Sequence, residues 1–223
     1  MLIFRAEQQI TLYPHRDENN LWRILNATLD GYPQYDYEAQ PIEYIKDGSR
    51  IKLRHISTDK CLHSHDVRPP VSDVDFQNEV SAYGMAGFEG DINDDWVVEI
   101  DKGDSRDKES SKRVRTLRTH FRLRHLNTGC FLFSHKVKLP EWGYEQQEVT
   151  CNKNAVKANS LWYIETAAKH PQCRWCALFR VCEGLIGCSA RRCGKGQLQG
   201  PRVFGQVLGV AAGDVDDQCW LDG

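Results

Sequence analysis

The most constraining feature of this chain is an internal repeat. Residues 53–65 and 123–135 share the pattern L-R-H-x-x-T-x-x-x-L-x-S-H without a gap, with seven identities over thirteen positions. Repeated units of this kind usually cannot bury their apolar faces alone, so neighbouring copies share a core. We therefore expect one fold that is built from both copies.

The similarity continues beyond these opening segments. Each full copy ends on a tryptophan followed by β-prone residues, Trp96 in one and Trp162 in the other. The N-terminus contains this closing half once more, ending at Trp22, without an L-R-H…S-H opening in front of it. The chain thus holds two and a half copies of a threefold repeat. The copies span about residues 7–25, 48–101 and 119–166.

Alternating apolar and polar residues predict β-strands in every copy. Two hairpins are expected at residues 50–65 and 121–135, with turns at residues 58–59 and 128–129. Four short strands per unit, three units and no helical periodicity predict an all-β fold, a β-trefoil whose first repeat is truncated. One tryptophan per unit is expected in the core: Trp22, Trp96 and Trp162.

The composition excludes several classes of protein. The chain has 29 Lys and Arg against 31 Asp and Glu, a net charge of −2, so it has no basic field to attract nucleic acid, and no nucleic-acid partner is expected. No segment approaches the roughly 18 uncharged apolar residues of a membrane-spanning helix. The N-terminal residues also lack the apolar core of a signal peptide.

The repeats carry a resemblance to a known family. The segments are QITLYPH and ENNLW within residues 9–22, LHSH at residues 62–65, and FSH and EQQEVTC within residues 133–151. They resemble the lumenal MIR domain of the dolichyl-phosphate-mannose–protein O-mannosyltransferases, above all the fungal type-two members. Soluble stromal-derived-factor-like proteins and the inositol trisphosphate and ryanodine receptors share this module. The run KLPEWGYEQQE at residues 138–148 distinguishes the chain from both.

The resemblance covers residues 7–171 and implies a MIR domain over residues 1–171. Members of the family transfer mannose to Ser or Thr of proteins entering the endoplasmic reticulum, but their catalytic acidic residues lie between membrane helices outside this module. We therefore expect no catalytic residue, cofactor or metal in this chain. The carboxylate pairs that it offers, such as Asp94–Asp95, are adjacent in sequence and point to opposite faces of a strand.

The function expected from the resemblance is binding. The partners would be mannosylated or Ser/Thr-rich acceptor proteins and the membrane portion of a mannosyltransferase in the endoplasmic reticulum. The alternative is a free-standing soluble protein of the same compartment that works beside chaperones. Arg and His side chains donate hydrogen bonds to sugar hydroxyls, and an aromatic ring can stack on a pyranose. The candidate ligand-binding residues are Arg54, His55, Ser64, His65, Arg124, His125, Ser134, His135 and Trp142.

A structural role for these repeated residues is the competing interpretation, because repeat positions are shared for folding at least as often as for function. It ranks ahead of binding for the Arg, His and Ser pairs. Trp142, in a loop rich in Pro and Gly, is the aromatic residue expected to be exposed and to stack on a ligand.

Three smaller motifs have chemical meaning. Cys61, His63 and His65 have metal-ligating side chains, but no second cluster accompanies them, so we predict no zinc site there. Cys130 and Cys151 lie on strands of one repeat and can form a disulfide if their distance permits it. The tripeptide that begins at Asn26 is an acceptor for N-glycosylation on an expected loop.

From residue 172 the chain changes character. Residues 172–223 hold six of the nine cysteines and nine of the 17 glycines, and strand alternation disappears. We interpret this segment as an irregular tail without an evolved fold, produced by a frameshift or by read-through of an intron; a small cysteine-rich module is the alternative. Because the first repeat lacks its opening half, the trefoil is expected to be marginal unless residues 1–6 and the tail substitute for the missing strands.

Overall fold

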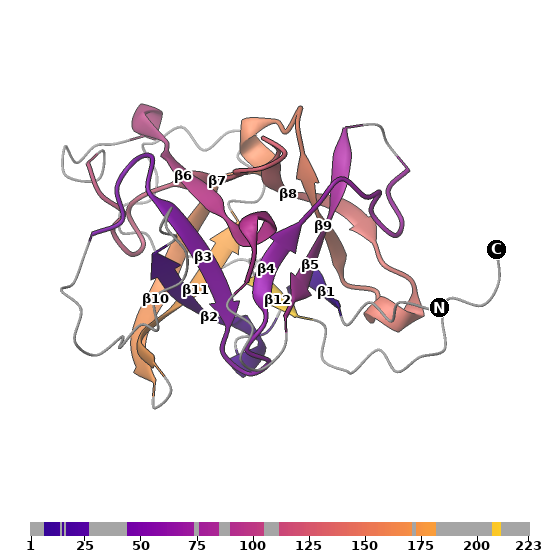
Figure 1. The fold of residues 1–223 in the computed structure, drawn as a ribbon, viewed down its shortest axis with the longest axis horizontal. Helices are drawn as coiled ribbons and strands as arrows, with labels where there is room; N and C mark the ends of the chain where they lie inside the picture. The colour runs from indigo at the N-terminus through magenta and orange to yellow at the C-terminus, as the bar shows by residue number, and fades with distance from the viewer. Residues whose placement is uncertain are drawn as a thin grey trace, which may run out of the picture.

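The computed structural model describes residues 7–13, 15, 17–26, 44–73, 76–84, 90–104, 112–170, 173–181 and 207–210. These residues form twelve β-strands, which Figure 1 shows as arrows. The strands are β1 (Gln8–Tyr13), β2 (Leu21–Asn26), β3 (Arg50–His55), β4 (Cys61–Ser64), β5 (Gln77–Tyr83), β6 (Trp96–Ile100), β7 (Phe121–His125), β8 (Phe131–Lys138), β9 (Gln147–Asn152), β10 (Trp162–His170), β11 (Cys173–Val181) and β12 (Val207–Val210).

Short 3-10 helices lie between the strands in the described ranges. Three of them, one in each unit, precede the strand that contains the unit's tryptophan, with no residue, one residue and two residues in between for η1, η2 and η5. None of the helices in the described part of the chain is long and apolar enough to span a membrane. The helices are η1 (Glu18–Asn20), η2 (Ile92–Asp94), η3 (Lys102–Asp104), η4 (Glu141–Gly143) and η5 (Lys157–Asn159).

The two predicted hairpins are confirmed. β3 pairs with β4 and β7 pairs with β8, both antiparallel. Each turn contains one residue with a left-handed backbone conformation. This residue is Asp59, with φ 57°, in the first hairpin and Gly129, with φ 75°, in the second. Asp and Gly are among the residues that adopt this conformation most readily. The same turn therefore recurs in both copies although the residue differs.

All of these strands belong to one antiparallel sheet that closes on itself. The order is β1-β12-β11-β10-β7-β6-β3-β4-β5-β9-β8, and β2 pairs with β11 and β3 (Figure 1). Closure follows because β1, at one end of this order, also pairs with β5 and β9 near the other end. A closed sheet has no free edge along its closing strands, so their backbone groups are paired inside the molecule.

The all-β prediction is confirmed, but the predicted β-trefoil is wrong. The strands form a closed antiparallel barrel with additional strands and not three equivalent four-stranded units. Two of the strands come from the segment after residue 171, where we predicted an irregular tail. β11 pairs with β10 and β2, and β12 pairs with β1 and β11. These pairings give the backbone groups of β1 and β2 partners inside the sheet.

The core contains the three tryptophans that end the units, as predicted. Trp22, Trp96 and Trp162 are fully buried. The indole Nε1 of Trp96 donates to the carbonyl of Leu62 at 3.0 Å, and that of Trp162 donates to the carbonyl of Leu132 at 3.1 Å. Each of these two rings therefore fills the core and also binds the returning strand of the hairpin in its own unit, which explains why the repeat retains tryptophan at this position.

A disulfide joins Cys130 and Cys151, whose Cα atoms lie 5.3 Å apart. Cys130 directly precedes β8 and Cys151 lies in β9, and these two strands pair along their length. Both sulfur atoms lie in the buried core. The covalent bond therefore reinforces a pairing that the backbone hydrogen bonds already make.

Reducing this disulfide should lower the free energy of unfolding by about 3 kcal/mol, because the unfolded chain loses a closed loop of 21 residues. Urea denaturation with and without a reductant measures the difference. A variant with both Cys130→Ala and Cys151→Ala is the matched control and should not respond to the reductant. An unchanged wild-type midpoint, with the bond shown to be broken by mass spectrometry, would contradict this prediction.

Candidate functional site

The repeated histidines His55 and His125 are fully buried. In each, Nδ1 contacts the threonine hydroxyl three residues later, at 2.9 and 2.8 Å, and Nε2 contacts a backbone carbonyl, at 3.1 and 2.8 Å. A carbonyl only accepts, so Nε2 carries the proton in both rings. The rings also pack at 5.0 Å against Trp22 and Trp96. Both nitrogens of each ring are therefore engaged inside the fold, which leaves none for a ligand.

Burial also determines the charge of these histidines. It lowers the pKa of His55 to about 4, and contacts with Asn19, Glu18 and Asp17 oppose this shift only in part. Burial lowers the pKa of His125 in the same direction. Both rings are consequently neutral at physiological pH, and they act as parts of the core.

The repeated serines have similar surroundings. Ser64 is fully buried, and its hydroxyl donates to the carbonyl of Glu79 at 2.7 Å. Ser134 is 4% exposed, and its carbonyl accepts a hydrogen bond from Asn159 at 3.1 Å. The burial of both serines and the hydrogen bond of the Ser64 hydroxyl favour the structural interpretation of the serine pair, whereas the Ser134 contact is made by its backbone.

The repeated arginines differ from each other. Arg54 is mostly buried, and its Nη1 lies 3.8 Å from a carboxylate oxygen of Asp59. Arg124 donates from Nε to Glu99 at 2.6 Å, and about a third of each of these two side chains is exposed. Of the two arginines, Arg124 is therefore the one that a ligand can reach more easily.

Arg124 belongs to a small outward-facing group on β6, β7 and β8. In the strand register Arg124 lies opposite Phe131, and Arg122 lies opposite Glu99. The guanidinium of Arg122 covers the Phe131 ring at 3.4 Å from its centroid. A cation, a carboxylate and an aromatic ring thus lie side by side on one face. We refer to Glu99, Arg122, Arg124 and Phe131 as the Arg124 surface.

The histidines that close the two repeats each meet a glutamate. His135 lies 3.2 Å from Glu148, a carboxylate that also accepts from the Ser72 hydroxyl and from the Val71 backbone N–H. Burial alone would raise the pKa of Glu148, but these hydrogen bonds outweigh burial and lower it. His65, in contrast, is partly exposed and lies 3.5 Å from Glu79. The pair at His135 is thus enclosed by the fold, whereas the pair at His65 is more open.

The remaining predicted residues have less structural support as sites. Trp142 is half-buried in η4, and the more exposed aromatic residue of that loop is Tyr144, which is 56% exposed. Asn26 is the last residue of β2, and the rest of its glycosylation tripeptide lies outside the described residues. Cys61 is a buried free thiol, and burial raises its pKa to about 11, so it is a poor metal ligand.

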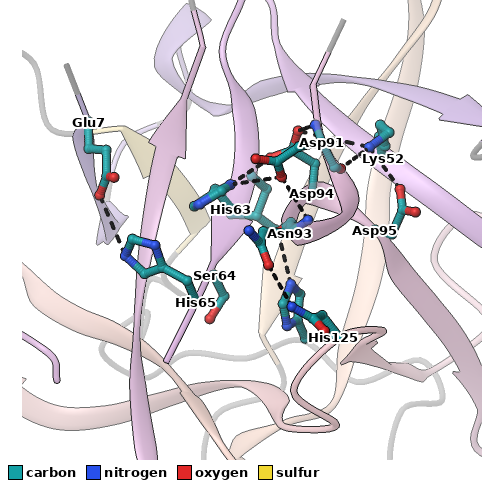
Figure 2. Close-up of polar contacts among 12 residues, drawn as sticks. Glu7, Lys52, His63, Ser64, His65, Asp91, Asn93, Asp94, Asp95 and His125 are labelled. Carbon is teal, nitrogen blue, oxygen red and sulfur yellow. Dashed lines mark hydrogen bonds and ion pairs between the residues drawn. The ribbon is translucent and has the colours of Figure 1, made fainter. Parts of the chain in front are cut away.

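Beside His65 lies a polar cluster that the repeat pattern did not predict (Figure 2). His63 is 3% exposed, and its Nδ1 contacts the fully buried carboxylate of Asp94 at 2.8 Å. The same nitrogen is 3.8 Å from Asp91, and the ring lies 5.1 Å from that of His65. Glu7, directly before β1, completes the group at 3.9 Å from His65. We refer to Glu7, His63, His65, Asp91 and Asp94 as the His63 cluster.

Cationic side chains lie near the second carboxylate oxygen of Asp94 and near the adjacent Asp95. Lys52 Nζ lies 3.9 Å from Asp94 Oδ2 and 2.8 Å from Asp95 Oδ1, and it donates to the Asp91 carbonyl. Arg50 forms a further ion pair with Asp95 at 2.9 Å. The negative charge of this buried region is thus largely balanced on the Lys52 side, whereas Glu7 has the imidazole of His65 as its neighbour among the described residues.

A comparison between the repeats would have identified this cluster. His63 stands where the other full copy has Phe133, and Asp94 stands where it has Ser160. Asn20 occupies the position of Asp94 in the first unit. Each of the two is the last residue of its 3-10 helix, and its side chain completes the capping box by accepting from the backbone N–H of the N-cap residue, Asp17 or Asp91. The fold itself therefore accepts an uncharged residue at each position. The signal is where the copies differ. Our binding-site predictions relied mainly on positions that the copies share, and His63 was considered only with Cys61 and His65 as a zinc site that we did not predict.

Comparison with known proteins places this barrel in a family. Residues 4–164 match the model of the MIR domain. The chain is 51% identical over 160 residues to dolichyl-phosphate-mannose–protein mannosyltransferase 1 of Saccharomyces cerevisiae, covering 71% of this chain and 19% of that protein. It is 39% identical over 163 residues to mannosyltransferase 2 of Candida albicans, covering 71% and 20%. The chain thus spans about a fifth of the length of the curated relatives it matches.

Two solved structures extend this likeness. The S. cerevisiae protein O-mannosyltransferase Pmt1-Pmt2 complex bound to the sugar donor matches with a TM-score of 0.65 and 46% identity, over 76% of this chain and 22% of that chain. The SDF2-like protein of Arabidopsis thaliana matches with a TM-score of 0.52 and 22% identity, over 71% and 93%. At this identity the second match concerns the fold alone. The family-level resemblance read from the repeats is confirmed.

Proposed function

Because the chain belongs to the MIR domain family, we propose that it is the acceptor-binding module of a protein O-mannosyltransferase. In this proposal the module recognises mannosylated or Ser/Thr-rich polypeptides and does not itself transfer mannose. It acts in the lumen of the endoplasmic reticulum, beside the membrane portion of the enzyme. The observation that carries the proposal is the likeness, in sequence and in fold, to one part of the solved mannosyltransferase complex.

The surroundings of the buried carboxylates support a role without catalysis. Asp94 contacts His63, and Asp95 contacts Arg50 and Lys52. Glu148 is held by His135 and Ser72, with a lowered pKa. A general acid needs a carboxyl whose pKa is raised towards neutrality and which can reach the substrate. Glu148 differs from such a group in both its pKa and its burial.

The Arg124 surface is the part of the molecule that best fits an acceptor. Arg124 offers N–H donors, Glu99 offers acceptor oxygens, and both are partly exposed and adjacent. Phe131 adds an aromatic ring in the same group. Hydroxyl groups of serine, threonine and mannose both donate and accept hydrogen bonds, so a paired cation and carboxylate next to a ring suit them.

Arg124→Ala should weaken binding of an acceptor peptide by about 10- to 100-fold, because hydrogen bonds from a charged donor contribute roughly 1.5–3 kcal/mol each. Isothermal titration with a Ser/Thr-rich peptide, and with the same peptide carrying single mannoses, measures this loss. Comparing the two peptides shows whether the module binds the hydroxyls of the serine and threonine side chains or those of the sugar.

Arg68→Ala is the matched control, because Arg68 is an exposed arginine paired with an aspartate, Asp73, outside the Arg124 surface. It should leave the affinity unchanged. An equal loss in both variants would indicate unspecific attraction by charge. Binding that is unaffected by Arg124→Ala would remove the Arg124 surface from the proposal, and absence of binding to either peptide would contradict the acceptor-binding function.

A further inference from the structure

We propose that Glu7, His63 and His65 form a binding site for a divalent transition-metal ion of the zinc type, with Asp94 as the residue that orients His63. One ligand atom from each of the three side chains lies within 4.8 Å of the other two. Two imidazoles and one carboxylate are a ligand set that zinc uses, with a water in the fourth position. This site is separate from the Arg124 surface and does not depend on the proposed function.

The contact with Asp94 prepares His63 for a metal. The Asp94 carboxylate accepts the proton of Nδ1 at 2.8 Å and is itself fixed by the Asp91 backbone N–H at 2.7 Å. The proton on Nδ1 leaves the lone pair of Nε2 in the neutral ring for a ligand. Metal-ligating histidines are commonly oriented by such a carboxylate. In Figure 2 the ring of His63 has its Nδ1 edge towards Asp91 and Asp94 and its opposite edge on the side of Glu7 and His65.

The Glu7 carboxylate supplies an independent indication of a missing partner. Its Oε2 atom is buried and accepts no hydrogen bond within the described part of the chain, and it lies 3.9 Å from Nε2 of His65. A buried charged oxygen without a hydrogen bond is costly, so a cation at this point would remove a penalty. Tetrahedral coordination at about 2.0–2.1 Å places ligand atoms about 3.3 Å apart. The Glu7 and His65 atoms, 3.9 Å apart, would have to approach by about 0.6 Å, and no pair of ligand atoms by more than about 1.5 Å.

A second grouping, His63 with Asp91 and Asp94, also brings three possible ligand atoms together. It is the weaker choice because Lys52 Nζ lies 3.9 Å from Asp94 Oδ2 and binds the Asp91 carbonyl. A metal ion there would face this ammonium group. On the other side of His63, His65 is partly exposed, and its Nε2 lies 3.9 Å from Glu7 and 3.5 Å from Glu79, so an ion there would meet carboxylates and no ammonium group among these neighbours.

The position of the site gives it a structural consequence. Glu7 directly precedes β1, whereas His63 lies in β4 and His65 directly follows that strand. A bound ion would join the start of the first strand to the end of the hairpin in the next unit. It would thus cross-link two segments that are 56 residues or more apart in the chain. Metal binding would stabilise the folded state through this link.

The test is zinc titration of the full chain with its accessible thiols alkylated, so that cysteines cannot bind the ion. We expect one zinc ion per chain that magnesium and calcium do not displace, because these hard cations prefer oxygen ligands. Glu7→Gln and His65→Ala should each weaken zinc binding by at least about tenfold. His15→Ala, which removes an exposed histidine outside the cluster, should leave the affinity unchanged.

Nitrogen-15 NMR of the histidine rings adds a readout that is specific to the site. Zinc should shift the Nε2 resonance of His63 while Nδ1 keeps its proton. Asp94→Asn should lower the affinity for zinc by about 10- to 100-fold. The variant should still fold, because asparagine occupies the equivalent position of the first unit, Asn20. No zinc binding by the wild-type chain, or equal binding by Glu7→Gln and His65→Ala, would overturn the proposed site. Unchanged affinity in Asp94→Asn would overturn the orienting role of Asp94.

Discussion

Trp96→Ala should lower the free energy of unfolding by about 3–5 kcal/mol, a large share of the stability of a domain of this size. Trp96 is fully buried, and its Nε1 is the donor for the Leu62 carbonyl. The change would leave a cavity and also leave that carbonyl without its partner. The Trp96 ring also packs against His125, which is the residue of the next unit that corresponds to His55. The hairpin of the next unit would therefore lose a contact as well.

Urea denaturation followed by circular dichroism measures this loss. Trp142→Ala is the matched control: it removes the same side chain from a half-buried loop position outside the core cluster. We expect it to have a clearly smaller effect. Equal losses in the two variants would mean that the core tryptophan has no special role in joining the hairpins.

Lowering the pH from about 7 to about 5 should destabilise the protein by about 2 kcal/mol through His55 alone. The folded pKa of His55 is about 4, below its ordinary value of 6.5, because the ring is buried. The unfolded chain therefore binds the proton first, and stability falls as the pH drops from 6.5 towards 4. His125 adds to the loss, since burial lowers its pKa in the same direction.

The lowered pKa of Glu148 affects the stability of the fold in a different pH range. A carboxyl with a depressed pKa stabilises the fold above its ordinary value of 4.5, and this contribution is lost only at lower pH. The loss between about pH 7 and about pH 5 should thus come from the histidines. It can be measured by urea denaturation at both pH values.

His55→Gln is the informative variant for this pH dependence, because glutamine keeps a donor and an acceptor but cannot be protonated. Its stability should vary less with pH than that of the wild type, whereas the exposed His15→Gln should keep the full dependence. A midpoint for His55 near 6.5 in an NMR titration would contradict the prediction directly.

The repeat alone was enough to predict the hairpins, the turns at Asp59 and Gly129, and the burial of the three tryptophans. These features depend on local alternation and on positions that both copies share. The same reasoning ranked a structural role above binding for the repeated residues. The burial of His55 and Ser64, with their polar atoms bonded inside the fold, favours that ranking.

The β-trefoil was wrong because the closure of the sheet depends on strands far apart in the chain. One partner of β1 is β12 and one partner of β2 is β11, both in a segment without a readable strand pattern. Alternation predicts that a strand exists, but it does not predict which distant strand will pair with it. Several strands were possible partners for β1 and β2, and only the tertiary structure decides among them.

The sequence by itself determined the all-β class, the repeated hairpins, the tryptophan core and the family, because each of these is written in short segments that recur. The tertiary structure alone decided that Glu7 meets His65 and that Asp94 meets His63, from residues that are 58 and 31 positions apart. The physical reason is that a metal site or an ion pair depends on distances of a few ångströms. Such distances arise only when separate units fold against a common core.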